Sequence, residues 1–209
     1  MNITLVGTGN MGSAFAKQFS SAGHQVRVTG RDMRKAERLA AQYEGVTAYP
    51  AAEVLGDSQI VVVVTAFADA VHALKSLGNL DGRIIVDVTN PLTADFMGLT
   101  IGHTTSAAEE IARAFPAAHI VKAFNTIFAQ VLSDGPAFGN DRTANVLIAA
   151  DDQPAKHAVK SLAQSLGWNT LDAGGITNAR YLEPLAGLNI YFGYGAAMGT
   201  QIVPTWLTR

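Results

Sequence analysis

The sequence predicts an α/β fold built on a doubly wound, mainly parallel sheet. Short apolar or β-branched runs alternate with segments in which apolar residues recur at helical spacing, and the connections between them are short. Hydrophobic residues make up 48% of the 209 residues and charged residues 15%, a balance that suits a sheet covered on both faces. No internal repeat or linker interrupts the pattern, so residues 1–209 are expected to form one domain with a C-terminal helical element.

The first half of the chain supplies four of the expected strands. They are placed at residues 3–6, 26–29, 60–65 and 83–88, with helices between them at residues 11–22, 34–42 and 70–77. Apolar residues at helical spacing predict the first of these helices, and Gly23 can supply the left-handed residue that ends it. The run 60–65 contains only β-branched residues, which is typical of a central parallel strand buried on both faces.

The second half continues the alternation. Strands are expected at residues 119–122, 145–149 and 168–171, helices at 107–115 and 155–166, and loops at 103–106 and 133–142. A long apolar helix is expected at about residues 178–200. No charged residue occurs from Pro184 to Thr208, but glycine, proline and amide residues dilute the hydropathy of this span. We therefore expect it to be buried against the core or a second subunit rather than to cross a membrane.

Charge and cysteine content exclude several classes of function. The formal net charge of −2 gives no broad attraction to nucleic acid or to an anionic membrane. The absence of cysteine excludes disulfides, thiolate metal sites and a cysteine nucleophile, and no other cluster with metal-ligand spacing is evident, so no metal is expected. The N-terminus carries no basic stretch before an apolar run, so we expect no secretion signal and a cytoplasmic location.

A glycine-rich turn follows the first expected strand and opens the first expected helix. Its residues are Gly7, Thr8, Gly9, Asn10, Met11 and Gly12, which match the pattern G-x-G-x-x-G. Gly7 permits the tight turn, Gly9 lets the backbone approach a pyrophosphate, and Gly12 allows close packing of helix on strand. The free N–H groups at the helix N-terminus suit the same anion. The sequence therefore predicts a dinucleotide site and a fold of the Rossmann type.

The residues after the second strand indicate which nicotinamide dinucleotide is bound. A site for NAD places a carboxylate at the end of that strand, where this chain has Gly30. Arg31 follows, with Arg34 and Lys35 close by, and a guanidinium suits the additional phosphate of NADP through forked, charge-assisted bonds. Asp32 is the opposing observation, because an NAD site could use it. We favour NADP(H), and we then expect Asp32 to turn away from the phosphate.

Five blocks of sequence occur in a familiar order. They are residues 7–12 (GTGNMG), 29–31 (TGR) with Lys35, 87–92 (DVTNPL), 121–126 (VKAFNT) and 179–185 (ARYLEPL). Together they resemble the coenzyme F420-dependent NADP oxidoreductase family, which also includes the cytoplasmic domain of the six-transmembrane ferric reductases. The resemblance covers nearly the whole chain. The blocks around Asn90 and Asn125 are more particular to this group than the glycine motif.

The resemblance implies a direct transfer of hydride from NADPH to a deazaflavin or flavin ring that stacks against its nicotinamide. It also implies that Thr8, Arg31 and Lys35 hold the phosphate on the adenosine ribose. The family commonly has serine at the position of Gly30, and this departure gives Arg31 more of the recognition. Coenzyme F420 and a flavin both remain open as the second substrate, because the resemblance does not decide between them.

Three further loops are expected at the carboxyl ends of strands, where open α/β sheets bind ligands. They contribute Thr65, Ala66 and Phe67, then Asn90 and Pro91, and finally Asn125, and all are expected to line the nicotinamide half of the site. For Asn125, ordinary turn chemistry is an equal alternative. No catalytic dyad can be recognised, and none is required, because hydride transfer between two rings needs alignment and exclusion of water.

The C-terminal helix is expected to complete the acceptor pocket or to form a homodimer interface. Glu183 at its start is expected to cap the helix or to pair with Arg180. Three functions stay open at this point. The first is an NADPH-dependent reductase of a flavin-like or deazaflavin acceptor, and the second is an NADP(H)-binding sensor without turnover. An imine or hydroxy-acid dehydrogenase ranks third, because the chain has no lysine after Lys160 and only a short C-terminal region.

Overall fold

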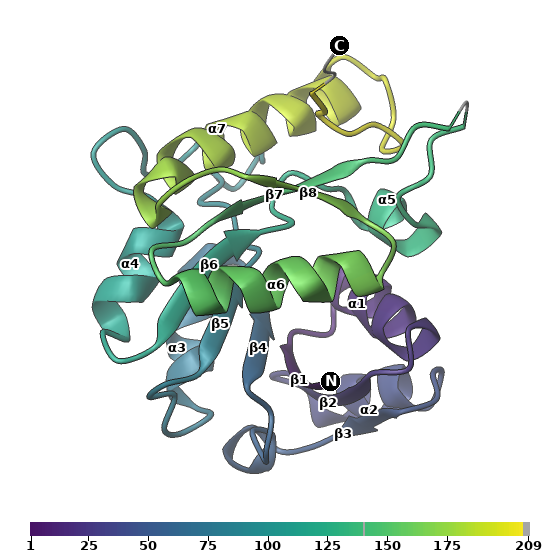
Figure 1. Ribbon diagram of the computed structural model, residues 1–209, viewed down its shortest axis with the longest axis vertical. Helices are drawn as coiled ribbons and strands as arrows, with labels where there is room; N and C mark the ends of the chain where they lie inside the picture. The colour runs from purple at the N-terminus through teal and green to yellow at the C-terminus, as the bar shows by residue number, and fades with distance from the viewer. Residues whose placement is uncertain (140, 207–209) are drawn as a thin grey trace.

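One sheet organises the computed structural model, which describes residues 1–139 and 141–206. Its eight strands over those residues lie in the order β3-β2-β1-β4-β5-β6-β7-β8 (Figure 1). They are β1 (Asn2–Val6), β2 (Gln25–Thr29), β3 (Val46–Ala48), β4 (Ile60–Val63), β5 (Ile84–Asp87), β6 (His119–Ala123), β7 (Asn145–Ala149) and β8 (Asn169–Asp172). Neighbours are parallel except β6 and β7, which run antiparallel. The predicted doubly wound, mainly parallel sheet is confirmed.

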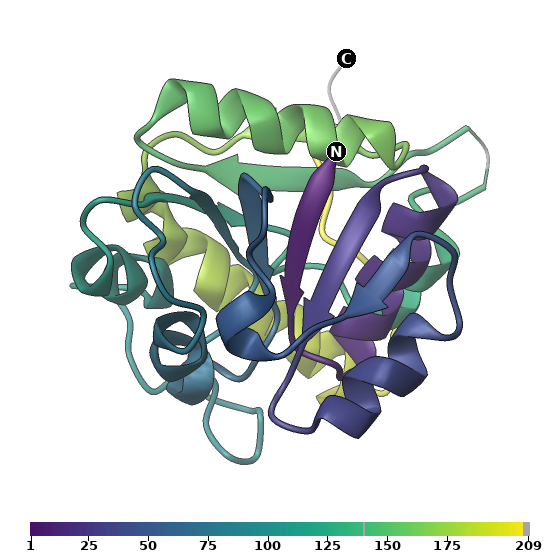
Figure 2. The ribbon, with the colours of Figure 1, turned by 90° about the horizontal axis from the view of Figure 1, so that it is seen from below.

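Helices cover both faces of this sheet. They are α1 (Asn10–Ser21), α2 (Met33–Ala40), α3 (Phe67–Lys75), α4 (Ala107–Ala114), α5 (Ala129–Asp134), α6 (Gln153–Ser165) and α7 (Ala179–Ile190), with short 3-10 turns η1 (Ala51–Glu53) and η2 (Ile176–Asn178) and a π-helical turn η3 (Tyr191–Gly195). Buried side chains of α1, α2, α5 and α6 pack on one face, and those of α3, α4 and α7 on the other. Figure 2 shows the helices α1 and α2 beside the first three strands.

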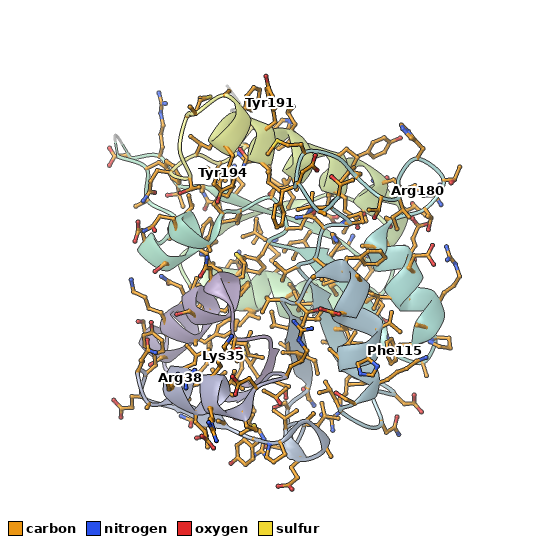
Figure 3. All side chains as sticks on the ribbon, turned by 180° about the vertical axis from the view of Figure 1, so that it is seen from behind. Lys35, Arg38, Phe115, Arg180, Tyr191 and Tyr194 are labelled. Carbon is orange, nitrogen blue, oxygen red and sulfur yellow. The ribbon has the colours of Figure 1, made fainter. Side chains whose placement is uncertain are left out.

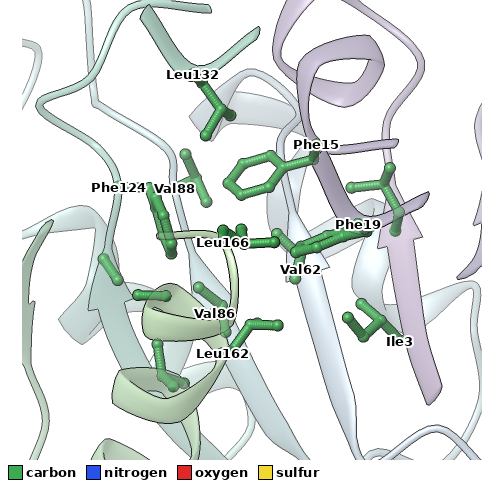
Figure 4. Close-up of a cluster of buried hydrophobic side chains, with 14 of the residues drawn as sticks. Ile3, Phe15, Phe19, Val62, Val86, Val88, Phe124, Leu132, Leu162 and Leu166 are labelled. Atoms are coloured by element: carbon green, nitrogen blue, oxygen red, sulfur yellow. The ribbon is translucent and has the colours of Figure 1, made fainter. Parts of the chain in front are cut away.

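The alternation of side chains along the strands builds these two cores. Ile3 and Leu5 of β1 belong to the core under α1, whereas Val6 belongs to the core under α3 and α4. In the first core the Phe15 ring lies 5.2 Å from the Phe19 ring and 5.2 Å, edge-on, from the Phe124 ring (Figure 4). Because Phe15 is on α1 and Phe124 follows β6, this packing fixes the glycine turn relative to the loop after β6.

Two short elements escaped the sequence analysis. β3 has three residues and lies at the sheet edge, too short to show a periodic pattern. α5 has six residues, of which Val131 and Leu132 are buried, and its end occupies the start of the loop expected at 133–142. α3 also begins at Phe67, three residues before the expected start at 70. A short loop therefore separates β4 from α3, and another separates β6 from α5.

The C-terminal helix is shorter than expected. α7 ends at Ile190 and passes into η3, so the prediction of one helix to about residue 200 is wrong. Glycine at 193 and 195 weakens the helix, and the N–H of Gly199 returns to bond the carbonyl of Gly193. An added Cβ at Gly193 would lie 2.7 Å from Phe128 Cζ, so glycine lets the chain pack on α5. Within the part of the chain described, no helix is long and apolar enough to cross a membrane.

Candidate functional site

The turn between β1 and α1 contains three glycines with different surroundings. Gly7 has φ +128°, a conformation that L side chains rarely adopt, and an added Cβ would lie 2.9 Å from Val64 Cγ2. A Cβ at Gly12 would lie 2.1 Å from the carbonyl oxygen of Gly7, so only glycine lets α1 approach this closely. A Cβ at Gly9 would meet no atom of the described chain within 4 Å. Neighbouring protein atoms therefore fill the space beside Gly7 and Gly12, whereas the space beside Gly9 is open.

The N-terminus of α1 faces this open side, with Gly9 as its N-cap residue. The first N–H groups of an α-helix have no partner within the helix, and the helix dipole adds partial positive charge there. The first turn of α1 contains no acidic residue that would compete for these groups. The turn therefore offers donors and positive potential to an anion.

A cavity of about 660 Å³ opens beside Gly9, and we call it the glycine-turn cavity. Its walls come from the loops after β1, β2 and β4 and from α3, with one residue each from α2 and η1. The lining residues are Val6, Gly7, Thr8, Gly9, Gly30, Arg31, Asp32, Lys35, Ala51, Val64, Thr65, Ala66, Asp69, His72, Ala73 and Ser76. Half of the predicted cofactor residues therefore meet at one place, at the carboxyl ends of parallel strands and at the point where the strand order reverses.

Basic side chains stand at one end of the glycine-turn cavity. The Arg31 side chain is 88% exposed, and its Nη1 lies 3.5 Å from Asp69 Oδ2. Lys35, on the first turns of α2, is also exposed (Figure 3). Asp32 is the N-cap residue of α2, where its Oδ1 accepts a hydrogen bond of 3.0 Å from the N–H of Arg34. That carboxylate lines the cavity, and its Oδ1 caps the helix that it begins.

The Thr8 side chain fills the space beside Gly30. An added Cβ at Gly30 would lie 3.0 Å from Thr8 Cγ2 and 3.2 Å from Thr8 Oγ1. The threonine hydroxyl therefore stands beside the position at which the family commonly carries serine. A polar group remains at this wall of the cavity although residue 30 has no side chain.

A second cavity, of about 550 Å³, lies on the other side of the turn, and we call it the apolar cavity. Met11 of α1 links it to the glycine turn, and the loops after β5 and β6 and the end of α7 form its walls. The lining residues are Met11, Val88, Asn90, Asp95, Phe96, Met97, Phe124, Asn125, Thr126, Ile127, Phe128, Ala129, Ala186, Asn189, Ile190 and Tyr194. Asn10, Gly12, Phe67 and Pro91, which were predicted to bind the cofactor, line neither cavity.

Two asparagine side chains join the walls of the apolar cavity. Asn90 Nδ2 donates to the Asn125 carbonyl oxygen at 2.8 Å, and Asn125 Nδ2 donates to Asn90 Oδ1 at 3.0 Å and to the Leu182 carbonyl at 2.9 Å. Asn125 is 6% exposed, and its Oδ1 has no hydrogen-bond partner among residues 1–139 and 141–206. The pair thus holds both loops and α7 together, and it leaves one buried acceptor in the cavity wall.

The backbone at this wall is strained. Phe124, which precedes Asn125, has φ +61° although it is not glycine. Its ring is buried between Phe15 of α1 and Trp168, and the centroids of the Phe124 and Trp168 rings lie 6.4 Å apart. Packing therefore holds a conformation that the residue alone would avoid, and such positions are concentrated at ligand-binding sites.

A buried ionic group behind the apolar cavity was not anticipated. Lys122 is fully buried, and its Nζ lies 2.8 Å from Asp87 Oδ2, 2.8 Å from Glu183 Oε1 and 2.5 Å from the carbonyl oxygen of Thr89. Desolvation raises the pKa of Glu183, an effect that the ammonium of Lys122 opposes. Asp87 ends β5, Lys122 is on β6 and Glu183 is on α7. We call these three residues the buried triad.

The predicted partner of Glu183 is wrong. Its carboxylate accepts hydrogen bonds from the N–H groups of Ala107 and Ala108, at 2.9 and 3.2 Å, and so caps α4 rather than its own helix. Arg180 instead forms two hydrogen bonds to Glu109, at 2.6 and 2.9 Å. A lysine inside an apolar strand was the available signal, because such a residue requires a buried partner of opposite charge.

Comparison with known proteins identifies the family. The family model for coenzyme F420-dependent NADP oxidoreductases matches residues 2–91. A crystal structure from Arthrobacter sp. FB24, provisionally named an F420-dependent NADP-reductase, superimposes with a TM-score of 0.89 at 32% identity, and the match covers 100% of both chains. This chain belongs to the coenzyme F420-dependent NADP oxidoreductase family. The resemblance seen in the sequence is confirmed.

Other relatives agree with this assignment to the family. The chain is 28% identical to F420-dependent NADP reductase from Methanothermobacter marburgensis, over 89% of each protein. It is 34% identical to Metalloreductase STEAP3 from Rattus norvegicus over 98% of its own length, but it spans 37% of that protein. All of these relatives are named as reductases. The chain is therefore an oxidoreductase of an NADP-dependent family, as predicted.

Proposed function

We propose that this protein transfers hydride between NADPH and a flavin-like or deazaflavin acceptor of the coenzyme F420 type. The observation that carries the proposal is the pair of cavities that flank one glycine turn. The glycine-turn cavity combines open helix N–H groups with Arg31 and Lys35, which suits the anionic half of NADP(H). The apolar cavity begins at Met11 and offers about 550 Å³, the size and apolar character expected for a ring-binding site.

When bound, NADPH supplies the hydride, and the acceptor ring receives it as the nicotinamide becomes oxidised. The protein's part is to align the two rings and to exclude water. Phe124 and Ile190 are apolar groups in the cavity wall, and the hydrogen-bonded Asn90–Asn125 pair keeps the loops in place. The unpartnered Oδ1 of Asn125 can accept an N–H donated by a carboxamide or a ring. No side chain is required to act as acid or base.

Transient kinetics tests turnover directly. NADPH oxidation followed by stopped flow, with flavin, deazaflavin and ferric acceptors in separate runs, is expected to be fast with a flavin or deazaflavin. Slow oxidation with every acceptor would favour the second function, an NADP(H) sensor without turnover. The imine or hydroxy-acid dehydrogenase is disfavoured, since hydroxy-acid enzymes of this type need a lysine in the C-terminal region and the chain has none after Lys160.

Arg31→Ala is expected to weaken binding of NADPH much more than binding of NADH, since only NADPH carries the added phosphate. Loss of a charge-assisted pair costs about 1.5–3 kcal/mol, or roughly 10- to 100-fold in Kd. Isothermal calorimetry with both dinucleotides measures the difference. Arg38→Ala is the matched control, because Arg38 is exposed on α2, which follows Arg31 in the chain, and does not line the cavity. Equal losses for NADPH and NADH would contradict the cofactor assignment.

We also propose that the C-terminal region mediates a homodimer. Large apolar side chains are exposed along α7 and beyond it, including Leu188 at 49% and Tyr191 at 52%. Tyr191 lies at the far end of α7 from Arg180 (Figure 3). Sedimentation equilibrium is expected to give twice the chain mass of 22.0 kDa. A Leu188→Asp/Tyr191→Asp variant is expected to be monomeric, and a monomeric wild-type protein would contradict the proposal.

A further inference from the structure

We infer that the acceptor site favours a flat ring with an uncharged substituent over the same ring carrying a phosphate or carboxylate tail. This inference rests on the proposed function, and it narrows the class of acceptor. It comes from the charges on the apolar cavity, compared with those on the glycine-turn cavity. Among the described residues, Asp95 is the one charged side chain that lines the apolar cavity.

Cationic side chains are also scarce on the described chain segments that surround the apolar cavity. Three of the segments that build the walls are residues 84–112, 123–139 and 181–206, and none of them contains a lysine or an arginine. The fourth, α1, contributes Met11 to the lining and carries Lys17. Proteins bind phosphate and carboxylate tails mainly with arginine, lysine and the N-termini of well-formed helices. α5 begins at this cavity, but it has only six residues and therefore a weak dipole. An anionic tail that leaves the apolar cavity meets no matching charge on these walls.

Cations on the neighbouring elements are already engaged. Lys122 is fully buried in the buried triad, and Arg180 is bound to Glu109 through two hydrogen bonds. Lys17 on α1 lies with its Nζ 3.3 Å from Ser133 Oγ. Freeing any of these groups for a ligand would first break the contacts that hold it.

The charge that does line the cavity repels an anion. Asp95 accepts hydrogen bonds from the Thr93 hydroxyl, at 2.5 Å, and from the Met97 N–H, at 3.1 Å. These two donors lower the pKa of Asp95 below its ordinary value, so the carboxylate is ionised at neutral pH. The glycine-turn cavity, in contrast, carries Arg31 and Lys35. The glycine-turn cavity thus has cationic side chains that suit a phosphate, whereas the described lining of the apolar cavity has none.

Two pairs of compounds isolate the tail from the ring. Riboflavin and FMN share a ring and differ by a phosphate, and 8-hydroxy-5-deazariboflavin and coenzyme F420 differ by a phosphate- and carboxylate-bearing tail. Quenching of ring fluorescence gives Kd for each compound, in low salt and without NADPH. We expect the neutral member of each pair to bind about three- to tenfold more tightly, with the gap closing as salt screens Asp95.

A charge-matched pair of variants assigns the effect to Asp95. Asp95→Asn keeps an oxygen for the Thr93 and Met97 donors and removes the charge, so the ratio of the FMN Kd to the riboflavin Kd is expected to fall toward one. Asp81→Asn changes the net charge equally at an exposed position outside both cavities, and it is expected to leave the ratio unchanged. A fall in both variants would show that only overall charge acts.

The outcomes separate this inference from the function on which it rests. Equal Kd values within both pairs, or tighter binding of FMN and coenzyme F420, would overturn the charge preference and leave hydride transfer intact. If no member of either pair quenches, the proposed acceptor class is itself wrong. Stopped-flow oxidation of NADPH by the same four compounds tests independently whether flavins or deazaflavins are acceptors at all.

Discussion

Gly9→Val is expected to abolish binding of NADPH and NADH alike while the fold persists. An added Cβ at Gly9 meets no atom of residues 1–139 or 141–206 within 4 Å, and the backbone there is extended, with φ −80°. The side chain would instead occupy the space beside the α1 N–H groups, where the pyrophosphate is proposed to lie. Loss of two charge-assisted hydrogen bonds corresponds to about 100-fold or more in Kd. Calorimetric titration with each dinucleotide measures this loss.

The fold is the control for this variant. Urea unfolding of Gly9→Val is expected to change the free energy of unfolding by no more than about 1 kcal/mol, the cost of a poorer N-cap. Gly12→Ala is the matched comparison, because its Cβ would lie 2.1 Å from the Gly7 carbonyl and must displace α1. It is expected to lose stability as well as binding. Wild-type affinity in Gly9→Val would mean that this turn is not the dinucleotide site.

The glycine turn could be predicted because its requirements are local. Gly7 needs its positive φ and Gly12 its close approach within a span of six residues, and each need is visible as a glycine at fixed spacing. The loops at the carboxyl ends of β4, β5 and β6 could be predicted for a similar reason. Each follows an apolar run whose end is visible in the sequence, and parallel pairing brings those ends to one edge.

The buried triad could not be predicted in the same way, because its members meet only in the folded chain. Lys122 and Asp87 are 35 residues apart, and Glu183 caps a helix that begins 76 residues before it. Spacing along a helix favoured Arg180 as the partner of Glu183, since residues three apart are neighbours. Packing of α7 on α4 and β6 provides a different partner for each: Glu109 for Arg180, and Lys122 for Glu183. The tertiary fold, rather than the local sequence, decides which charged residue pairs with a buried one.

The end of α7 shows the same limit. The uncharged span predicts burial, and its glycines at 193 and 195 weaken the helix without fixing its end at Ile190. The reason lies in Phe128, whose ring fills the position that a side chain at residue 193 would take. The resulting turn brings Tyr194 to the wall of the apolar cavity, edge-on to Phe128 with ring centroids 5.8 Å apart. A residue that lines the apolar cavity thus depends on a helix ending whose exact position the sequence pattern does not mark.

Lys122→Met is expected to cause the largest loss of stability, about 3–5 kcal/mol in the free energy of unfolding. The substitution keeps most of the side-chain volume and removes the ammonium. It leaves the carboxylates of Asp87 and Glu183 buried without their shared cation. Urea unfolding at pH 7.5 measures the change. Arg113→Met is the control, since it breaks an exposed pair with Glu110 and is expected to cost less than about 1 kcal/mol.

The loss is expected to shrink as the pH falls, and the sign follows from Glu183. Burial already raises the pKa of this carboxyl, and removal of the Lys122 ammonium raises it further. Between the ordinary pKa of 4.5 and the raised value, the folded variant binds a proton that the unfolded chain does not. Stability therefore rises as pH falls through that window and is lost as pH rises. A loss that does not change over an assay range of about pH 5.5 to 8 would contradict a buried charge as its cause.

The same variant tests whether the buried triad shapes the acceptor site. Asp87 precedes the loop of Asn90, Lys122 precedes the loop of Asn125, and Glu183 lies on the helix that closes the cavity. Because one ammonium joins all three walls, its removal is expected to weaken acceptor binding more than dinucleotide binding, since the helix that follows the glycine turn also has the Phe15–Phe19 contact within it. Adding Glu183→Gln to Lys122→Met removes the second unpaired charge and is expected to recover part of the stability. Failure to recover any would place the damage in packing rather than in charge.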